Sequence, residues 1–321
     1  MAALPEQPAP SLVDLRQVRV DDIEPLLAEE TAIWEQRLDW DFRPSADLVR
    51  RFIRMQSLGG FALVSGRRVM GYVYYVCEER KGLVGDVFLT AAMDTPDLEA
   101  ALLDAAIRAL GSLGFVERIE SQMMLASPEI RRRLPMAERT RCFRRNLMAL
   151  DLRPAPALAP KESAGRFQYE PWHEREHEQA ARLISKTYRG HVDAEINDQY
   201  RTTAGARRFL TNIVQYPGCG SFFQPGSLVA VDPADGRLAG ICLASLVAFD
   251  VGHVTQVCVD PEWQGRGVGW ELMRRSIEAM AGHGCRKATL TVTSSNRAEQ
   301  LYQRMGFRTA HSFDAVVWEL R

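Results

Sequence analysis

The chain has 321 residues, of which 46% are hydrophobic and 25% charged, and its formal net charge is −1. This length allows two ordinary domains, and the near-neutral charge gives no reason to expect nucleic acid or an anionic membrane as a main partner. No apolar run approaches the roughly 20 residues of a membrane-spanning helix. Residues 1–10 also lack the basic start and apolar core of a secretory signal. We therefore expect a cytoplasmic protein that binds neither nucleic acid nor membrane.

The cysteines are scattered, with no C-x-x-C pair and no histidine spacing typical of zinc. We expect reduced thiols and no metal site. The six positions are Cys77, Cys142, Cys219, Cys242, Cys258 and Cys285.

Residues 12–152 predict a first domain, preceded by an Ala- and Pro-containing tail, residues 1–11, that we expect to be disordered. The segment 90–97 contains no glycine, and Thr95 or Asp97 is expected to cap the helix that follows it. The expected elements, in chain order, are a strand at 18–20, a helix after Asp21 and Asp22, a helix that ends near Ser57, a hairpin of strands 61–64 and 69–77, a strand at 83–89, and a helix at 98–113.

A linker with three prolines, residues 153–165, precedes a second domain at 166–321. The expected elements there are a strand at 166–172, helices at 174–189 and 203–216, strands at 227–231, 238–249 and 253–259, a helix at 268–281, a strand at 287–293, a helix at 297–305, and a strand at 313–320. This order predicts a mixed α/β (α+β) fold, with a mostly antiparallel central sheet flanked by helices. The first half is predicted to be a fainter version of the same fold.

The stretch 257–270 joins a predicted strand to a helix through Gly265, Gly267 and Gly269. Successive N–H groups in such a loop, with the unpaired N–H groups at the start of the helix, form a cradle for an anion such as phosphate. Glycine suits these positions because a Cβ would block the approach of phosphates. The spacing is neither the G-x-G-x-x-G of a dinucleotide fold nor a P-loop, because no Gly-Lys-Ser/Thr follows.

The sequence Val-x-Pro followed by Gln-x-x-Gly-x-Gly resembles the acyl-CoA pyrophosphate loop of the GCN5-related N-acetyltransferase (GNAT) superfamily. The resemblance implies two tandem acetyltransferase-like domains, of which only the second kept the cofactor loop. It also implies acetyl-CoA as co-substrate, a strand that pairs with the pantetheine arm, and a strand N–H at the oxyanion. The implied cofactor-binding residues are Val257, Cys258, Val259, Gln264, Gly265, Arg266, Gly267, Val268, Gly269, Trp270, Ser295 and Asn296.

The stretch 295–307 resembles the family's Asn-x-x-Ala-x-x-Leu-Tyr-x-x-x-Gly-Phe segment, with Ser295 in the asparagine position and Asn296 one residue later. Asn296 and Glu299 could instead form a capping box. The resemblance implies that Tyr302 protonates the departing CoA thiolate, because a phenol of pKa about 10 stays protonated at neutral pH. A plain core tyrosine is the alternative. For Cys258, an inert buried thiol is favoured over a nucleophile.

No carboxylate lies on the strand 288–293, where many family members place a general base, so Asp250, His253 or a water molecule remain as candidates.

We interpret the protein as a monomeric or dimeric N-acetyltransferase that acts by direct attack of a small-molecule primary amine. Acetylation of a peptide or protein N-terminus is one alternative, and a non-catalytic acyl-CoA sensor, which would not need Tyr302, is another. The layout resembles that of the mycothiol synthases, whose acceptor is a cysteinyl amine, but layout does not fix the acceptor.

Overall fold

The computed structural model describes residues 10–216 and 219–321, so most of the expected tail lies outside the described residues. The chain forms two compact units. Unit 1 contains residues 10–38, 42–144 and 313–321, and unit 2 contains residues 39–41 and 145–312.

The unit boundaries differ from the sequence-based division, which separated the domains at residues 153–165 and left 313–321 in the second. The chain passes from unit 1 to unit 2 within β6 (Thr140–Asp151) and returns within β13 (Arg308–Glu319). Hydrogen bonding explains this exchange. Residues 314–319 of β13 pair with strand β5 (Arg118–Met123) of unit 1, and residues 145–151 of β6 pair with β12 (Lys287–Thr293) of unit 2.

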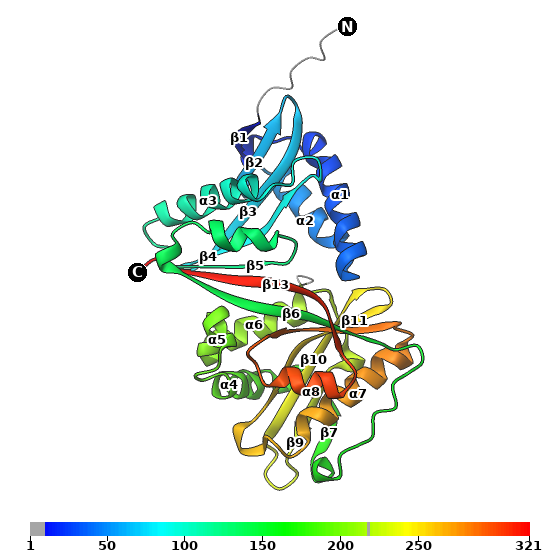
Figure 1. The fold of residues 1–321 in the computed structure, drawn as a ribbon. Coiled ribbons are helices and arrows are strands. Elements are labelled where there is room, and N and C mark those ends of the chain that lie inside the picture. The colour runs from blue at the N-terminus through cyan, green and yellow to red at the C-terminus, as the bar shows by residue number, and fades with distance from the viewer. Residues whose placement is uncertain (1–9, 217–218) are drawn as a thin grey trace. The chain divides into compact units, whose positions relative to one another are not determined.

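Unit 1 has a sheet in the order β1-β2-β3-β4-β5-β13, antiparallel except for the parallel pair β4–β5. Helix α3 packs on one face, and α1 and α2 pack on the other (Figure 1). Its further elements are β1 (Ser11–Asp14), α1 (Val20–Leu38), α2 (Arg43–Arg54), β2 (Gly59–Ser65), β3 (Arg68–Glu78), β4 (Lys81–Leu89) and α3 (Pro96–Ser112).

Unit 2 repeats this plan with the order β6-β12-β11-β10-β9-β7, antiparallel except for the parallel pair β11–β12. Helix α7 covers one face, and α4 and α6 cover the other. Its further elements are β7 (Gln168–Pro171), α4 (His177–Thr187), α5 (Asp193–Ile196), α6 (Thr203–Gln215), β8 (Ser221–Phe222), β9 (Leu228–Val231), β10 (Leu238–Ala248), β11 (Val251–Val259), α7 (Val268–His283) and α8 (Ala298–Arg304). The predicted mixed, mostly antiparallel fold is confirmed.

The start of unit 1 differs from the prediction. The expected strand at 18–20 is wrong, because α1 already begins at Val20 and the first strand is β1, which starts at Ser11 inside the expected tail. Asp21 and Asp22 lie in the first turn of α1, where carboxylates interact favourably with the helix dipole. The alternation Val-Arg-Val was too short to distinguish a strand from the entry to a helix.

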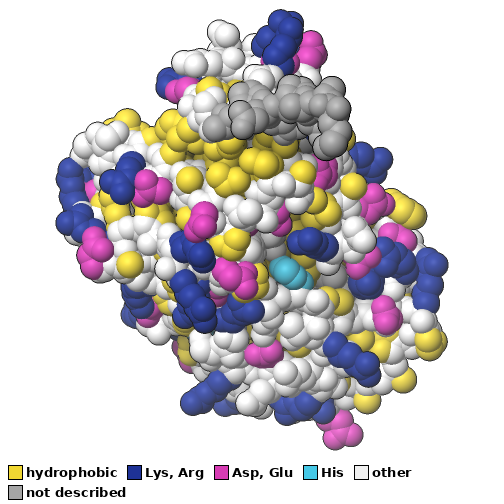
Figure 2. Space-filling model, turned by 45° about the horizontal axis from the view of Figure 1, so that its top comes forward, with side chains coloured by type: hydrophobic (Ala, Val, Ile, Leu, Met, Phe, Trp, Pro, Cys, Tyr) yellow, Lys and Arg dark blue, Asp and Glu magenta, His cyan; other side chains and the backbone are white. Residues whose placement is uncertain are grey.

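The surface carries charges of both signs. Figure 2 shows Lys and Arg side chains interspersed with Asp and Glu over one face, in keeping with the net charge of −1. None of the described helices is both long and apolar enough to cross a bilayer.

Candidate active site

The glycine loop between β11 and α7 owes its shape to two backbone conformations. Gly265 and Gly267 have φ values of 74° and 82°, in the left-handed region where glycine is strongly favoured. Gly269 does not share this conformation and lies in the first turn of α7, where a Cβ would lie 3.4 Å from Cγ2 of Val259. The loop therefore needs glycine at two of the three predicted positions for reasons of backbone geometry.

The backbone donors of this loop are unpaired. The N–H groups from Gly265 to Trp270 have no hydrogen-bond partner within the described residues, and the first bond of the helix runs from the Glu271 N–H to the Gly267 carbonyl at 3.0 Å. Buried or partly buried N–H groups normally find a partner. A run of free donors at the positive end of a long helix is an anion-binding site.

The predicted linker lies against this loop. A Cβ on Gly267 would come within 3.0 Å of Lys161 Cβ and Ser163 Oγ. The indole N–H of Trp270 donates to the Ala159 carbonyl at 2.8 Å, and Lys161 Nζ lies 4.8 Å from the Trp270 ring centroid. The space beside Gly267 is therefore occupied by the linker, which brings a lysine to the loop, whereas the space beside Gly265 is open.

Two further predicted cofactor residues have local partners. The Gln264 amide donates to the Val259 carbonyl at 3.1 Å, so it joins the loop to the end of β11. The Arg266 guanidinium lies 5.0 Å from the Trp263 ring centroid and forms no ion pair within the described chain. Arg266 is therefore free to meet an anion at the loop.

Strand β11 separates from β12 halfway along its length. The parallel pairing covers only Val251–Val254 of β11. A β-bulge at Thr255 follows, where Thr255 Oγ1 donates to the Leu243 carbonyl at 3.0 Å. Beyond the bulge, one edge of β11 has no strand partner, as β-augmentation by an extended ligand requires.

The register shows which backbone groups face this gap. The Asp260 N–H donates to the carbonyl of Ala239 in the neighbouring strand β10 at 2.9 Å, so Asp260 and Cys258 direct their backbone groups toward β10. Alternation along the strand then directs the N–H and C=O groups of Val257 and Val259 into the gap. These two residues are the predicted partners of an extended arm.

Cys258 is placed as an inert thiol. Its side chain is 5% exposed and packs with α4 and α6, and burial raises its pKa to about 12. A thiol in this environment is not a nucleophile at neutral pH.

Tyr302 lies on α8 with its ring 6.2 Å from that of Phe307. The side chain is 6% exposed, and its hydroxyl has no hydrogen-bond partner among the residues that the structure describes. Burial, followed by the neighbouring Cys242 and the charge of Asp193, raises the pKa of Tyr302 well above its ordinary value. The phenol therefore stays protonated, and its O–H remains available to a ligand.

Asp193 is a further candidate for the site, and the sequence did not indicate it. It begins α5, and its carboxylate accepts hydrogen bonds from Thr293 Oγ1 and, at 3.3 Å, from Asn296 Nδ2. Its side chain is 14% exposed, and its negative charge contributes to the raised pKa of Tyr302. No motif marks this position, because its partners lie about a hundred residues further along the chain.

The side-chain oxygen of Asn296 has a structural role. Its Oδ1 accepts from the Ala298 N–H at 2.9 Å and so caps α8. The expected capping box with Glu299 does not form, because the Glu299 carboxylate accepts from Asn146 Nδ2 at 3.0 Å. Ser295 is exposed, and nothing in the structure gives it a role.

The two side chains considered as bases lie at the other end of β11. His253 is buried, its Nδ1 is 2.9 Å from Thr289 Oγ1, and burial lowers its pKa to about 4. Asp250 accepts a hydrogen bond from Arg286 Nε at 3.0 Å. His253 and Val257 are four positions apart along the strand, a distance of about 13 Å. Neither lies beside the open edge of β11.

An aromatic pair adjoins the same half of β11. The rings of Tyr188 and Tyr200 stack with centroids 4.5 Å apart. Gln256 donates to the Tyr188 hydroxyl at 2.8 Å and accepts from the Tyr200 hydroxyl at 3.3 Å. The polar groups of Gln256 are thereby satisfied within the protein.

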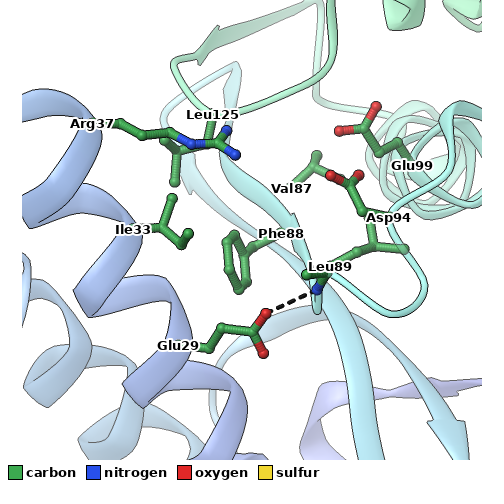
Figure 3. Close-up of a pocket in the computed structure, with 10 residues that line it drawn as sticks. Glu29, Ile33, Arg37, Val87, Phe88, Leu89, Asp94, Glu99 and Leu125 are labelled. Carbon is green, nitrogen blue, oxygen red and sulfur yellow. Dashed lines mark hydrogen bonds between the residues drawn. The ribbon is translucent and has the colours of Figure 1, made fainter.

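Unit 1 has the same strand geometry without the cradle. Strand β4 pairs with β5 only over Lys81–Val84, and a bulge at Gly85–Asp86 follows opposite Tyr74, as at Thr255 in unit 2. Glu29 of α1 accepts from the first free backbone donor after the strand, the Ala91 N–H, at 2.8 Å (Figure 3). It also accepts from Thr90 Oγ1 at 2.7 Å. The adjoining pocket of ≈ 40 Å³ has room for only a few water molecules.

Comparison with known proteins agrees with this geometry. The model of the acetyltransferase (GNAT) family matches residues 195–307. Mycothiol acetyltransferases of Acidimicrobium ferrooxidans and Thermobifida fusca are 33% identical over 105 residues and 40% identical over 96 residues, covering 31% and 27% of this chain. A putative ribosomal protein bS18-alanine N-acetyltransferase of Bacillus subtilis is 32% identical over 75 residues, 23% of this chain and 49% of that protein. The match to the two mycothiol acetyltransferases spans about a third of their length, 34% and 30%.

Solved structures show the same fold over the whole chain. A GCN5-related N-acetyltransferase from Sphaerobacter thermophilus has a TM-score of 0.70 at 18% identity and covers 99% of this chain and 98% of its own. A tandem GNAT protein from the clavulanic acid biosynthesis pathway has a TM-score of 0.62 at 15% identity, with coverage of 97% and 99%. At identities of 18% and 15%, the similarity to these two structures is evidence for a shared fold alone.

Proposed function

We propose that this protein transfers an acetyl group from acetyl-CoA to the primary amine of a small molecule, because residues 195–307 match the model of the acetyltransferase (GNAT) family. Unit 2 performs the reaction, and unit 1 is a degenerate copy without a cofactor loop. The acceptor amine attacks the thioester directly, without a covalent intermediate on the protein.

The observation that carries this proposal is the run of unpaired N–H groups from Gly265 to Trp270, which adjoins the open edge of β11. Acetyl-CoA has a pyrophosphate followed by an extended amide-containing arm, and the two features lie in the same order. The loop would hold the pyrophosphate, with Arg266 and Lys161 as nearby cations. The backbone of Val257 and Val259 would pair with the two amides of the arm.

The chain supplies groups for each charge that develops in the reaction. The carbonyl oxygen of the thioester becomes negative when the amine attacks, and the Val257 N–H points into the gap where that oxygen would lie. The carbon–sulfur bond then breaks, and the Tyr302 hydroxyl donates to the sulfur. Since its raised pKa makes Tyr302 a weak acid, this hydrogen bond stabilises the thiolate before the proton is transferred.

Asp193 would accept the proton that the amine loses. Its charge acts on Tyr302, and Thr293 and Asn296 fix its orientation. A carboxylate held in this way can also attract the acceptor as an ammonium ion and place it beside the thioester. This assignment replaces Asp250 and His253 as the candidate base.

The relatives favour a small-molecule acceptor over a peptide, because mycothiol acetyltransferases recur among them. The Bacillus subtilis relative, which is named for an alanine of a ribosomal protein, is the reason to test the peptide alternative as well. A sensor that only binds acyl-CoA would not need the free hydroxyl of Tyr302.

Calorimetric titration of the full chain with CoA tests the cofactor site. Gly265→Ala places a Cβ at a left-handed position in the loop, and it is expected to weaken CoA binding at least tenfold. Gly236→Ala is the matched control, because Gly236 has φ 71° and equally open surroundings in a turn between β9 and β10. Equal CoA affinity in the two variants would contradict the proposed site.

Thiol release from acetyl-CoA, measured with a panel of small amines and short peptides, tests the reaction. Turnover with small primary amines supports the proposal. Turnover with peptides alone would move the assignment to an N-terminal acetyltransferase, and CoA binding without any turnover would favour the sensor.

A further inference from the structure

A short segment between α4 and α5 joins the two strands that separate in unit 2. Tyr188, directly after α4, accepts a hydrogen bond from Gln256 of β11 through its hydroxyl at 2.8 Å. Five residues later, the Asp193 carboxylate accepts hydrogen bonds from Thr293, the last residue of β12, and from Asn296. The segment between Tyr188 and Asp193 therefore contacts β11 at one end and β12 at the other.

His191 lies inside this segment, and the backbone around it is well defined. Its N–H donates to the Tyr188 carbonyl at 3.0 Å. Gly190, just before it, has a φ of 72°, a left-handed conformation that suits glycine in such a turn. The His191 carbonyl then accepts from the Ala194 N–H at 3.0 Å, where α5 begins. Both backbone groups of His191 are thus bonded, and its ring has a defined place beside the separated strands.

The imidazole ring of His191 contacts both ends of the segment. It packs edge to face against Tyr188, with ring centroids 5.2 Å apart. Its Nδ1 accepts from the Asp193 backbone N–H at 3.1 Å and lies 3.6 Å from Asp193 Oδ2. Because an N–H donates to Nδ1, the neutral ring carries its proton on Nε2. Nε2 has no hydrogen-bond partner within the described residues.

Asp193 needs a way to lose a proton once it has accepted one. Its side chain is 14% exposed, whereas that of His191 is 32% exposed. Its two oxygens already accept from Thr293 and Asn296. The titratable groups in contact with the His191 ring are Asp193 and Tyr188. The unprotonated Nδ1 of His191 is therefore the basic nitrogen that lies next to the Asp193 carboxylate.

We propose that His191 carries the proton of the acceptor amine from Asp193 to water and so returns Asp193 to its ionised form for the next turnover. The inference rests on the proposed function, because it requires Asp193 to accept that proton. Since His191 acts through Asp193, it is a positioning residue for the proton and not a catalytic residue.

The proton balance has three steps. The N–H bond of the acceptor breaks, its electron pair stays on nitrogen, and the proton moves to Asp193 Oδ2. The carboxyl O–H bond then breaks as the lone pair of His191 Nδ1 takes the proton. The imidazolium passes a proton to water, and the ring returns to the Nε2–H form that the Asp193 N–H favours. The separation of 3.6 Å is long for this transfer, and such contacts commonly shorten when a substrate binds.

His191→Asn distinguishes this role from a purely structural one. An asparagine side chain can accept from the N–H two residues later, as Nδ1 does here, but it cannot take up a proton. Thiol release from acetyl-CoA by the full chain, with the best amine of the panel, is the assay. His191→Asn is expected to lower kcat at least tenfold, with the KM for the amine and the affinity for CoA unchanged. His283→Asn, at an exposed position in the last turn of α7, is the matched control and should keep full activity.

His191→Ala is the second variant, and imidazole added to the solution should restore part of its lost kcat. Thermal melts check that both variants fold. Full kcat in His191→Asn, a rise in the KM for the amine in place of a fall in kcat, or no rescue of His191→Ala by imidazole would overturn the role of His191 while leaving the proposed function in place. No thiol release by the unaltered chain with any amine would overturn both.

Discussion

The carboxylate of Glu29 accepts a hydrogen bond from the backbone N–H of Ala91 at 2.8 Å, directly after strand β4. In unit 2 the chain beyond the equivalent strand continues into the glycine loop, whose N–H groups are unpaired. Unit 1 thus satisfies a backbone donor after its strand with its own carboxylate, whereas the donors of the unit 2 loop have no partner in the described chain. The difference between the two halves is chemical, since the bulge and the separation of the strands occur in both.

This relationship predicts one CoA site per chain. Calorimetric titration of the full chain with CoA should give a stoichiometry of one. Gly265→Ala should weaken CoA binding at this site, and no second CoA site should then be detected. Glu29→Gln, which removes the charge but keeps an acceptor for Ala91, should leave both affinity and stoichiometry unchanged. A stoichiometry of two, or a site that survives Gly265→Ala at full affinity, would show that unit 1 binds the cofactor as well.

Tyr302→Phe is expected to lower kcat by about 10² to 10³-fold, because it removes the hydrogen-bond donor for the leaving sulfur. The affinity for CoA should change little, since the ring remains. Stability should also be nearly unchanged, because the hydroxyl has no partner in the described chain. Tyr216→Phe, at an exposed position, is the matched control for steady-state kinetics. Unchanged kcat in Tyr302→Phe across pH 6–9 would show that Tyr302 is only a core residue.

Asp193→Asn is expected to reduce kcat/KM for the amine by at least tenfold, while CoA affinity stays the same. The asparagine can still accept from Thr293, so a purely structural role would be largely preserved. Loss of the acidic limb of the pH–rate profile would identify Asp193 as the proton acceptor. Asp250→Asn tests the rival base and should have little effect, because Asp250 is held by Arg286. If Asp250→Asn reduced kcat/KM for the amine and Asp193→Asn did not, Asp250 would be the better candidate for the base.

Contiguous features of the site could be predicted from the sequence, and features assembled across the fold could not. The loop at 264–269 and Tyr302 can be named as candidates from the sequence, because each lies in a continuous stretch with its own spacing. Asp193 was missed because it joins the site through Thr293 and Asn296. Asp250 and His253 are near the glycine loop in sequence, but the strand β11 places His253 about 13 Å from Val257.

The same reason explains the errors in the fold. Composition marks residues 153–165 as a break, but the units exchange strands where β6 and β13 find their ladder partners. Such pairing depends on segments far apart in the chain. The linker also has a defined place, because the Trp270 indole donates to the Ala159 carbonyl and the missing Cβ of Gly267 leaves room for Lys161 and Ser163.

The desolvated carboxyl of Asp86, on β4 of unit 1, predicts a pH-dependent stability. The pKa of Asp86 is raised from 3.8 in the unfolded chain to about 7 in the folded one, so between these values the folded state binds more protons. Its contribution to stability is fully present below about pH 4 and is lost as the pH rises through 7, with a slope of up to about 1.4 kcal/mol per pH unit. Urea unfolding at pH 5, 6, 7 and 8 should show this decline. Asp86→Asn should flatten the decline and be more stable than the unaltered chain at pH 8, whereas Asp94→Asn should not. Parallel pH profiles for all three proteins would mean that Asp86 is charged and well solvated in the folded state.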